Sequence, residues 1–277
     1  MNNFALLLLI ASPSSTPPVD IAVIGASASA GWGVVVERPP TAARIPIHHR
    51  HLDLAAAIGA SLGSEHADVS RYVDALFFIQ PLTTGAAEVT AAIQGDPDVV
   101  VGIDFLFWYA YGHVPAPQAS RGEVTTRLAL LQHGLRELER FDVPLLIGDL
   151  PDMSSAADIK PIAMLTASQV PSSQALAALN DQIAAWASER DNVTLLPLAA
   201  TMESLRGGGG LAVDETPWPI DASYIQFDQL HPSVEGLLFL AAMVAARLDD
   251  GMEGVTAEVS PEQLRQRVNG MTSDPAP

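Results

Sequence analysis

The run Ile21-Ala22-Val23-Ile24-Gly25, followed by Ala26-Ser27-Ala28-Ser29-Ala30-Gly31, decides the fold. An unbroken run of apolar, β-branched residues that ends at a glycine predicts a strand buried on both faces. Strands of this kind belong to parallel sheets that are covered by helices on each side. The small residues that follow let the chain turn sharply at the carboxyl end of the strand, which is where such sheets bind ligands.

The rest of the chain alternates between strand and helix patterns. Further strands are predicted at 75–80, 99–103, 143–147 and 193–196, and helices at 52–62, 86–94, 124–141, 172–190 and 234–248. This alternation predicts an α/β protein, a three-layer α/β/α sandwich around a parallel sheet of about five strands. We assign residues 1–18 to a leader, 19–260 to one domain and 261–277 to a frayed C-terminal tail.

Composition restricts the possible functions. The 277 residues are 48% apolar and 17% charged, which supplies a large core. Acids outnumber bases by 32 to 14, and the resulting net charge of -18 repels nucleic acid and anionic lipid. The chain has no cysteine, which excludes disulfides, thiolate catalysis and cysteine-bound metals.

The N-terminal segment has some features of a secretory signal. Residues 4–11 form an apolar run, and residues 12–18 are rich in serine and proline. The run is too short to span a bilayer but has the length of a signal core, so we expect a secreted or periplasmic protein without stable membrane insertion. No Lys or Arg precedes the run, as one normally does in a signal. A cytoplasmic protein with a leader is therefore the alternative, and the oligomeric state is open.

Two segments carry residues suited to nucleophilic catalysis. Ser27 lies in the small-residue turn after the first predicted strand, where a helix start would point free N–H groups at an anion. Asp228 precedes His231 by three residues, so one local turn can hold the imidazole in a fixed tautomer. Each segment also has an ordinary interpretation. The first is then a plain turn or a phosphate site, and the second a solvated histidine before a helix.

Together the two segments resemble the SGNH/GDSL serine hydrolases. In that family a Gly-Asp-Ser segment follows the first strand, and an Asp-x-x-His pair precedes the last helix. Gly25-Ala26-Ser27 and Asp228-x-x-His231 hold those places here, with Ala26 where the family has Asp. The resemblance implies a flavodoxin-like fold and the hydrolysis of carboxylic esters, either acyl or O-acetyl, in a small molecule or saccharide. It implies Ser27 as nucleophile, His231 as base and Asp228 as its partner, with no cofactor and no metal.

The resemblance also implies an oxyanion hole with three donors. The first is the N–H of Ser27, and Gly85 is the match for a glycine that follows the second strand in the family. Where the family has Gly-x-Asn after the third strand, this chain has Gly102-Ile103-Asp104. An ionised carboxylate cannot donate a hydrogen bond, so Asp104 serves as third donor only when it is protonated. From the sequence we therefore expect Asp104→Asn to raise kcat.

Aromatic residues follow the third predicted strand. Phe105, Phe107 and Trp108 are predicted to line an acyl or sugar pocket, with packing into the core as the alternative. Asp149 and Asp152, after the fourth strand, are interpreted as rim residues.

Two other functions remain open. A non-catalytic ligand- or carbohydrate-binding module on the same fold is favoured by the missing Asn. A phosphate-binding protein is disfavoured, because no Lys lies near the Gly25–Gly31 turn. His48, His49 and His51 lack a carboxylate at ligand spacing, so no metal site is predicted there.

Overall fold

The computed structural model describes residues 18–37, 49–62, 67–113, 122–160, 163–220, 223–252 and 255–271. A five-stranded sheet in the order β4-β1-β5-β6-β7 forms its centre, and every pair of neighbouring strands is parallel. The strands of the sheet are β1 (Val19–Gly25), β4 (Ala67–Val73), β5 (Val99–Gly102), β6 (Leu145–Gly148) and β7 (Val193–Leu196).

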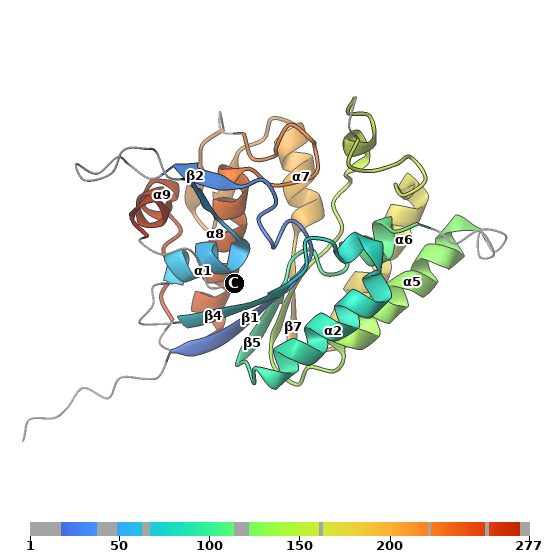
Figure 1. Ribbon diagram of the computed structural model, residues 1–277, viewed down its shortest axis with the longest axis horizontal. Coiled ribbons are helices and arrows are strands. Elements are labelled where there is room, and N and C mark those ends of the chain that lie inside the picture. The colour runs from blue at the N-terminus through green and yellow to red at the C-terminus, as the bar shows by residue number, and fades with distance from the viewer. Residues whose placement is uncertain are drawn as a thin grey trace, which may run out of the picture.

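Helices cover both faces of this sheet, as Figure 1 shows. One face is covered by α1 (Leu54–Leu62) and α8 (Val234–Gly251), with α9 (Pro261–Gly270) packed against both helices. The other is covered by α2 (Pro81–Gln94), α3 (Phe107–Tyr111), α5 (Glu123–Leu138) and α6 (Ser173–Ser188). The predicted three-layer α/β/α sandwich is therefore confirmed.

The remaining elements are short. They are the pair β2 (Val35–Glu37) and β3 (His49–His51), the pair β8 (Leu211–Val213) and β9 (Thr216–Trp218), the helix α7 (Leu198–Arg206), and the 3-10 turns η1 (Phe77–Ile79) and η2 (Ser154–Ala157). No helix in the described part of the chain is long and apolar enough to cross a membrane.

The central strand β1 shows why the buried strands have unbroken apolar sequences. Ile21 and Val23 point into the core beneath α1 and α8, whereas Ala22 and Ile24 point into the core beneath α2, α5 and α6. All four side chains are almost completely buried. Successive residues of a strand face opposite sides, so a strand between two helical layers must be apolar at every position.

The second strand lies upstream of the predicted one, so the strand prediction at 75–80 was wrong. The chain places β4 at Ala67–Val73 and turns residues 77–79 into η1. β4 is an edge strand of mixed polarity, partly exposed, and lacks the continuous apolar run that marks its neighbours. In η1, Phe77 is buried while Phe78 and Ile79 are exposed, which is a single-turn pattern.

The predicted frayed tail was also wrong over 261–270. Helix α9 begins there, with Ser260 accepting a hydrogen bond from the N–H of Gln263 at the N-cap. Leu264 and Val268 are buried against the core at helical spacing. Residues 1–17, 272–277 and His48 lie outside the described residues, so the predicted leader stays a prediction.

Candidate active site

The candidate site lies where the chain reverses direction across the sheet. From β1 the chain moves first to β4 on one side and then to β5 on the other, so β1 and β5 flank a topological switch point. Ligands in open α/β sheets bind at such a point, outside the carboxyl ends of the strands. Ser27 follows β1 and Asp104 follows β5, and both line the same cavity.

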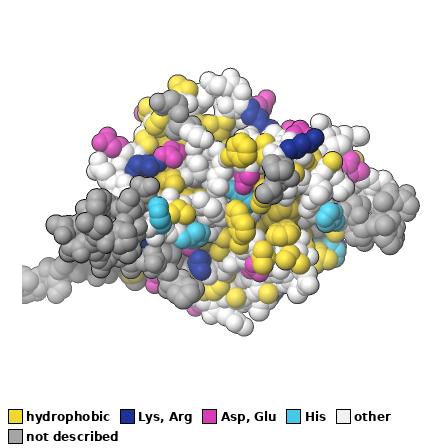
Figure 2. All heavy atoms as spheres, turned by 45° about the horizontal axis from the view of Figure 1, so that its top comes forward, with side chains coloured by type: hydrophobic (Ala, Val, Ile, Leu, Met, Phe, Trp, Pro, Cys, Tyr) yellow, Lys and Arg dark blue, Asp and Glu magenta, His cyan; other side chains and the backbone are white. Residues whose placement is uncertain are grey.

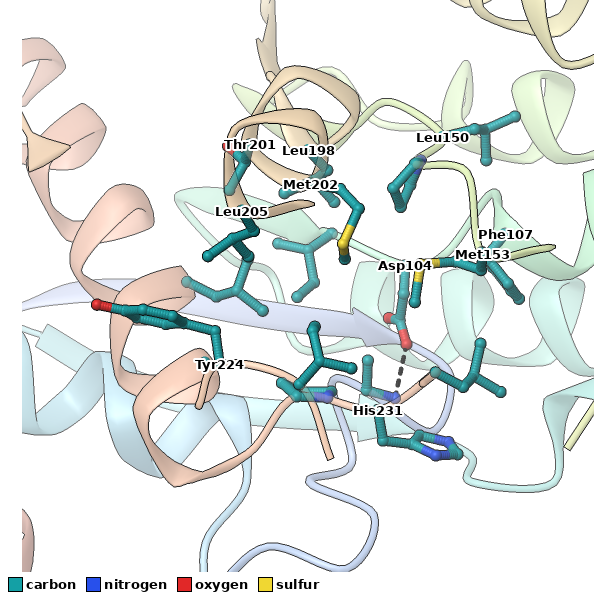
Figure 3. Close-up of a pocket in the computed structure, with 18 of the residues that line it drawn as sticks. Asp104, Phe107, Leu150, Met153, Leu198, Thr201, Met202, Leu205, Tyr224 and His231 are labelled. Atoms are coloured by element: carbon teal, nitrogen blue, oxygen red, sulfur yellow. Dashed lines mark hydrogen bonds between the residues drawn. The ribbon is translucent and has the colours of Figure 1, made fainter. Parts of the chain in front are cut away.

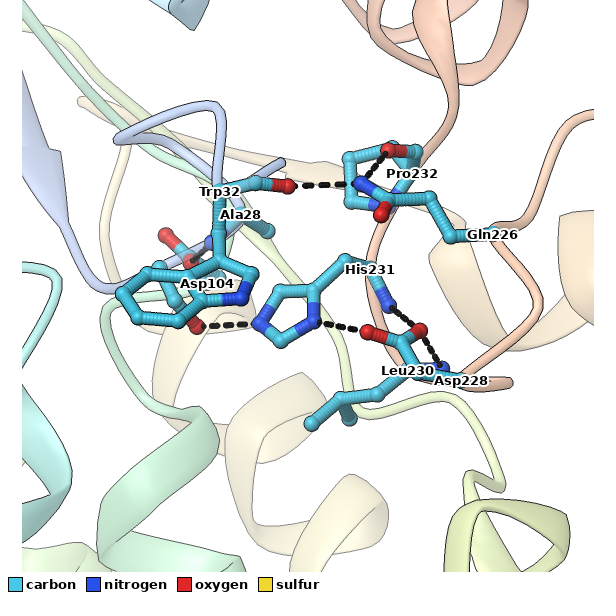
Figure 4. A network of polar contacts seen from close by, with 9 residues as sticks. Ala28, Trp32, Asp104, Gln226, Asp228, Leu230, His231 and Pro232 are labelled. Carbon is cyan, nitrogen blue, oxygen red and sulfur yellow. Dashed lines mark hydrogen bonds and ion pairs between the residues drawn. The ribbon is translucent and has the colours of Figure 1, made fainter. Parts of the chain in front are cut away.

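Ser27, His231 and Asp228 form one chain of hydrogen bonds. The Nε2 atom of His231 lies 2.9 Å from Oγ of Ser27, and its Nδ1 lies 2.7 Å from Oδ2 of Asp228. Ser27 and His231 are buried, with 8% and 2% of their surfaces exposed. Figure 4 shows the imidazole of His231 and its contact with Asp228. This arrangement can pass a proton from the serine hydroxyl to the imidazole.

The Asp228 carboxylate is held by the loop that carries it. Its Oδ1 accepts hydrogen bonds from the backbone N–H groups of Leu230 and His231, at 3.0 Å each. Burial opposes its ionisation, but the bonds from His231 and these N–H groups outweigh burial and lower the pKa of Asp228. The carboxylate is therefore ionised near neutral pH, where it can hold a protonated imidazole.

Gln226 ties the histidine loop to the nucleophile turn. Its side-chain Nε2 donates to the carbonyl of Trp32 at 2.6 Å and to that of Pro232 at 2.8 Å, as Figure 4 shows. Its backbone N–H donates to the carbonyl of His231. One amide thus joins two loops that are 194 residues apart in sequence. This link holds Ser27 and His231 in position relative to each other. Sequence reasoning missed this residue, since only its position two residues before Asp228 marks it.

Asp104 does not act as an oxyanion donor, because its carboxylate is an acceptor for the nucleophile turn. Oδ1 accepts from the N–H of Ala26 at 3.0 Å and from Oγ of Ser29 at 2.6 Å. Oδ2 accepts from the N–H groups of Ala28 at 2.9 Å and Ser29 at 3.2 Å. All four donors surround Ser27 in sequence. A carboxylate from the loop after β5 thus holds this turn, and this contradicts the predicted third donor.

A second acid supports the same turn from α2. Glu88 is buried, and its Oε2 accepts a hydrogen bond from the N–H of Gly25 at 3.0 Å. Burial, together with the nearby charges of Asp104 and Asp74, raises the pKa of Glu88 to about 9. Glu88 is therefore neutral at pH 7. It is the only acid in α2, a lone charge between apolar residues, and that was the signal that sequence reasoning missed.

Gly85 lies away from the candidate oxyanion hole. It is the fifth residue of α2, where an N–H bonds to the carbonyl four residues earlier and is not free for a substrate. A Cβ at this position would overlap the Tyr109 hydroxyl and crowd the ring of Phe77. Gly85 therefore allows α2 to pack against an aromatic cluster, and the predicted role in the oxyanion hole is contradicted.

One of the three predicted donors has a free N–H group. Within the described part of the chain, the N–H of Ser27 makes no hydrogen bond, whereas those of Ala26, Ala28 and Ser29 all bond to Asp104. The described lining of the cavity contains no Asn or Gln. The amide expected from the family resemblance is therefore not replaced by another side-chain amide in that lining.

The predicted aromatic residues separate into two groups. Phe107 and Trp108 line the cavity beside Ser27. Phe105 is completely buried and packs against Phe77 and Tyr109 in the core. Of the predicted rim residues, Asp149 lines the cavity, and its Oδ1 accepts the N–H of Ala199 at the start of α7.

No group of three or more His, Asp or Glu residues in the described part of the chain could hold a metal ion. His49 and His51 lie in β3, both exposed.

Comparison with known proteins identifies relatives at the level of structure. No family model and no curated protein matches the sequence. Axe2, an acetylxylan esterase from Geobacillus stearothermophilus, matches with a TM-score of 0.50 and 14% identity over 88% of this chain and 100% of its own. BT4096, a gut microbial diltiazem-metabolizing enzyme, matches with a TM-score of 0.50 and 8% identity over 82% of this chain. The match covers 46% of BT4096, so this chain spans about half of that protein.

Identities this low establish a shared fold and nothing finer. The strand order, the covering helices and the structural match to Axe2 all agree. The chain therefore has the fold of the SGNH-type esterases.

Proposed function

We propose that this chain is a serine hydrolase that cleaves carboxylic esters of small molecules or saccharides. The observation that carries the proposal is the hydrogen-bonded chain from Ser27 through His231 to Asp228, in which Ser27 and His231 are buried at the switch point of the sheet. The description of Axe2 as an acetylxylan esterase supports ester hydrolysis on this fold. No step of the mechanism below requires a metal or a cofactor.

The first half of the reaction acylates Ser27. Its Oγ attacks the ester carbonyl while Nε2 of His231 takes the hydroxyl proton. The tetrahedral intermediate carries its negative charge on the former carbonyl oxygen, which the free N–H of Ser27 can stabilise. One such donor contributes roughly 3–4 kcal/mol to the transition state. The intermediate collapses when the C–O bond to the alcohol breaks, and His231 returns the proton to the leaving alkoxide.

The second half regenerates the enzyme. A water molecule gives a proton to His231 and attacks the acyl carbon, and the bond to Oγ of Ser27 then breaks as His231 returns the proton to Oγ. The products are a carboxylic acid and free Ser27. Asp228 stabilises the imidazolium in both halves through its 2.7 Å contact with Nδ1.

Hydrolysis of p-nitrophenyl butyrate tests this proposal. Ser27→Ala and His231→Ala should each lower kcat/KM by about 10⁴-fold, because each removes a member of the proton-transfer chain. Ser188→Ala is a matched control, since that exposed hydroxyl bonds only to the carbonyl of Ala185 in its own helix. Equal activity in wild type and Ser27→Ala would refute the proposal. An absence of turnover with every ester would favour the binding-module alternative.

A further inference from the structure

An apolar cavity opens beside the nucleophile. It has a volume of about 110 Å³ and includes Ser27, His231 and Asp104 in its wall. Figure 3 shows it between α7 and the carboxyl ends of the strands. In Figure 2, apolar side chains gather on the face at this end of the sheet.

Helix α7 contributes one wall of the cavity. Leu198, Met202 and Leu205 lie at i, i+4 and i+7, so they share one face of the helix, and all three line the cavity. None of them is fully buried, although they are the apolar face of α7. A helix whose apolar face stays partly exposed to a cavity leaves hydrophobic surface for a ligand to cover.

Most polar side chains of the cavity are already engaged, although the buried Nε1 of Trp108 has no hydrogen-bond partner in the described part of the chain. Asp104 accepts four hydrogen bonds from the nucleophile turn, and Asp149 accepts the N–H of Ala199. The hydroxyls of Thr201 and Tyr224 donate to the carbonyls of Pro197 and Pro219. The described lining contains no Asn, Gln, Lys or Arg. A sugar ring would lose hydrogen bonds to water here without replacing them, whereas a hydrocarbon chain would lose none.

The acyl side of the ester fits this cavity better than the alcohol side. The leaving alkoxide must take its proton from Nε2 of His231, so the alcohol lies along that ring. Trp32 stands beside the imidazole, with 6.0 Å between ring centroids, and is 42% exposed. The alcohol can therefore leave past Trp32 to solvent, while the acyl group stays bonded to Ser27 and extends under α7.

We propose that this cavity is an acyl pocket that selects linear chains of about four to six carbons over acetyl. The proposal rests on the esterase function proposed above. Because an apolar protein cavity of about 150 Å³ takes up benzene, 110 Å³ accommodates a slightly smaller group. Each methylene transferred from water into such a site should raise kcat/KM by about fourfold. Chains beyond about eight carbons should lose this gain, because the cavity is then full.

Two series of esters separate the acyl side from the alcohol side. The first keeps p-nitrophenol and extends the acyl chain from two to twelve carbons, and the second keeps acetate and extends a primary alcohol. We expect kcat/KM for hexanoate to exceed that for acetate by at least tenfold in the first series and to stay nearly flat in the second. A preference for acetate, or a gain confined to the second series, would overturn the acyl pocket.

A matched pair of variants on α7 tests the location. Met202→Trp fills the cavity and should lower the hexanoate-to-acetate ratio by about tenfold, whereas Glu203→Trp places the same ring on the exposed face and should leave the ratio unchanged. Equal hexanoate-to-acetate ratios in the two variants would show that α7 is not the wall that determines acyl-chain selectivity.

Ligand binding separates failure of the pocket from failure of the esterase function. Calorimetry with 2-octanone, which cannot be hydrolysed, should show binding to wild type and to Ser27→Ala that is weakened by Met202→Trp. Binding of 2-octanone without ester turnover would refute only the esterase function. Turnover that depends on Ser27, with no binding of 2-octanone and no chain preference, would refute only the acyl pocket.

Discussion

Replacing Asp104 with Asn tests the new role of this carboxylate, and the structure reverses the effect expected from the sequence. In the most favourable orientation, the amide oxygen takes the place of Oδ2 and keeps the bonds from Ala28 and Ser29. The amide NH₂ then takes the place of Oδ1, where the Ser29 hydroxyl can turn to accept it. The N–H of Ala26 faces that NH₂ and loses its acceptor.

The loss of stability can be estimated from these contacts. One orphaned backbone N–H and the loss of charge from the remaining bonds together destabilise the fold by about 3 kcal/mol. The turn that carries Ser27 should shift, and a displacement of this kind lowers kcat by roughly 10- to 100-fold. Asp104→Asn should therefore lower both the free energy of unfolding and kcat, whereas the sequence alone predicted a higher kcat.

Urea unfolding and the kcat for p-nitrophenyl butyrate provide the measurements. Asp98→Asn is the matched control, because that carboxylate accepts one exposed hydrogen bond, from the N–H of Asp20. Asp98→Asn should change the free energy of unfolding by no more than about 0.5 kcal/mol. A higher kcat in Asp104→Asn with unchanged stability would show that residue 104 faces the oxyanion, and our interpretation of the turn would be wrong.

Three further predictions concern buried contacts. The pKa of Glu88 rises from 4.5 to about 9 on folding, so its contribution to stability is complete below pH 4.5 and is lost as pH rises towards 9. Glu88→Gln, which stays neutral, should match wild type in urea unfolding at pH 4.5 and exceed it by about 3 kcal/mol at pH 7, and equal stabilities at both pH values would contradict this. Gly85→Ala should destabilise by about 1–3 kcal/mol in thermal unfolding, because its Cβ meets Tyr109, although Ala normally stabilises a helix; a higher Tm would refute the clash. Gln226→Ala should lower kcat more than it raises KM, since it frees the histidine loop, and a change in KM alone would exclude this role.

The parts of the fold that could be predicted from the sequence are those with unbroken apolar runs. β1, β5, β6 and β7 lie within two residues of their predicted positions, because a strand buried on both faces has to be apolar throughout. The edge strand β4 has no such constraint, so its sequence lacks the apolar run that residues 75–80 display. The helix α9 was missed because its buried apolar residues are limited to Leu264 and Val268, too few for a clear helical pattern.

In the candidate site, contacts within one turn could be predicted from the sequence, whereas contacts between distant segments could not. The Asp228–His231 pair could be predicted because both residues lie in one turn, and Ser27 because it follows a strand. The partners of Asp104 and Glu88 could not, since each bond joins segments more than 60 residues apart in sequence. The oxyanion role of Gly85 was predicted because this glycine follows the strand expected at 75–80. The second strand lies at Ala67–Val73 instead, and Gly85 lies within α2.

Covalent labelling of Ser27 is the most direct test of the central claim. We expect intact-mass analysis to show that a fluorophosphonate adds once to the wild-type protein, with loss of fluoride and a bond to Oγ of Ser27. Its 2.9 Å contact with His231 makes this hydroxyl the activated one, whereas the Ser29 hydroxyl donates to Asp104. The adduct should be absent from Ser27→Ala. An adduct that persists in Ser27→Ala and maps to Ser29 would show that Ser27 is not the nucleophile.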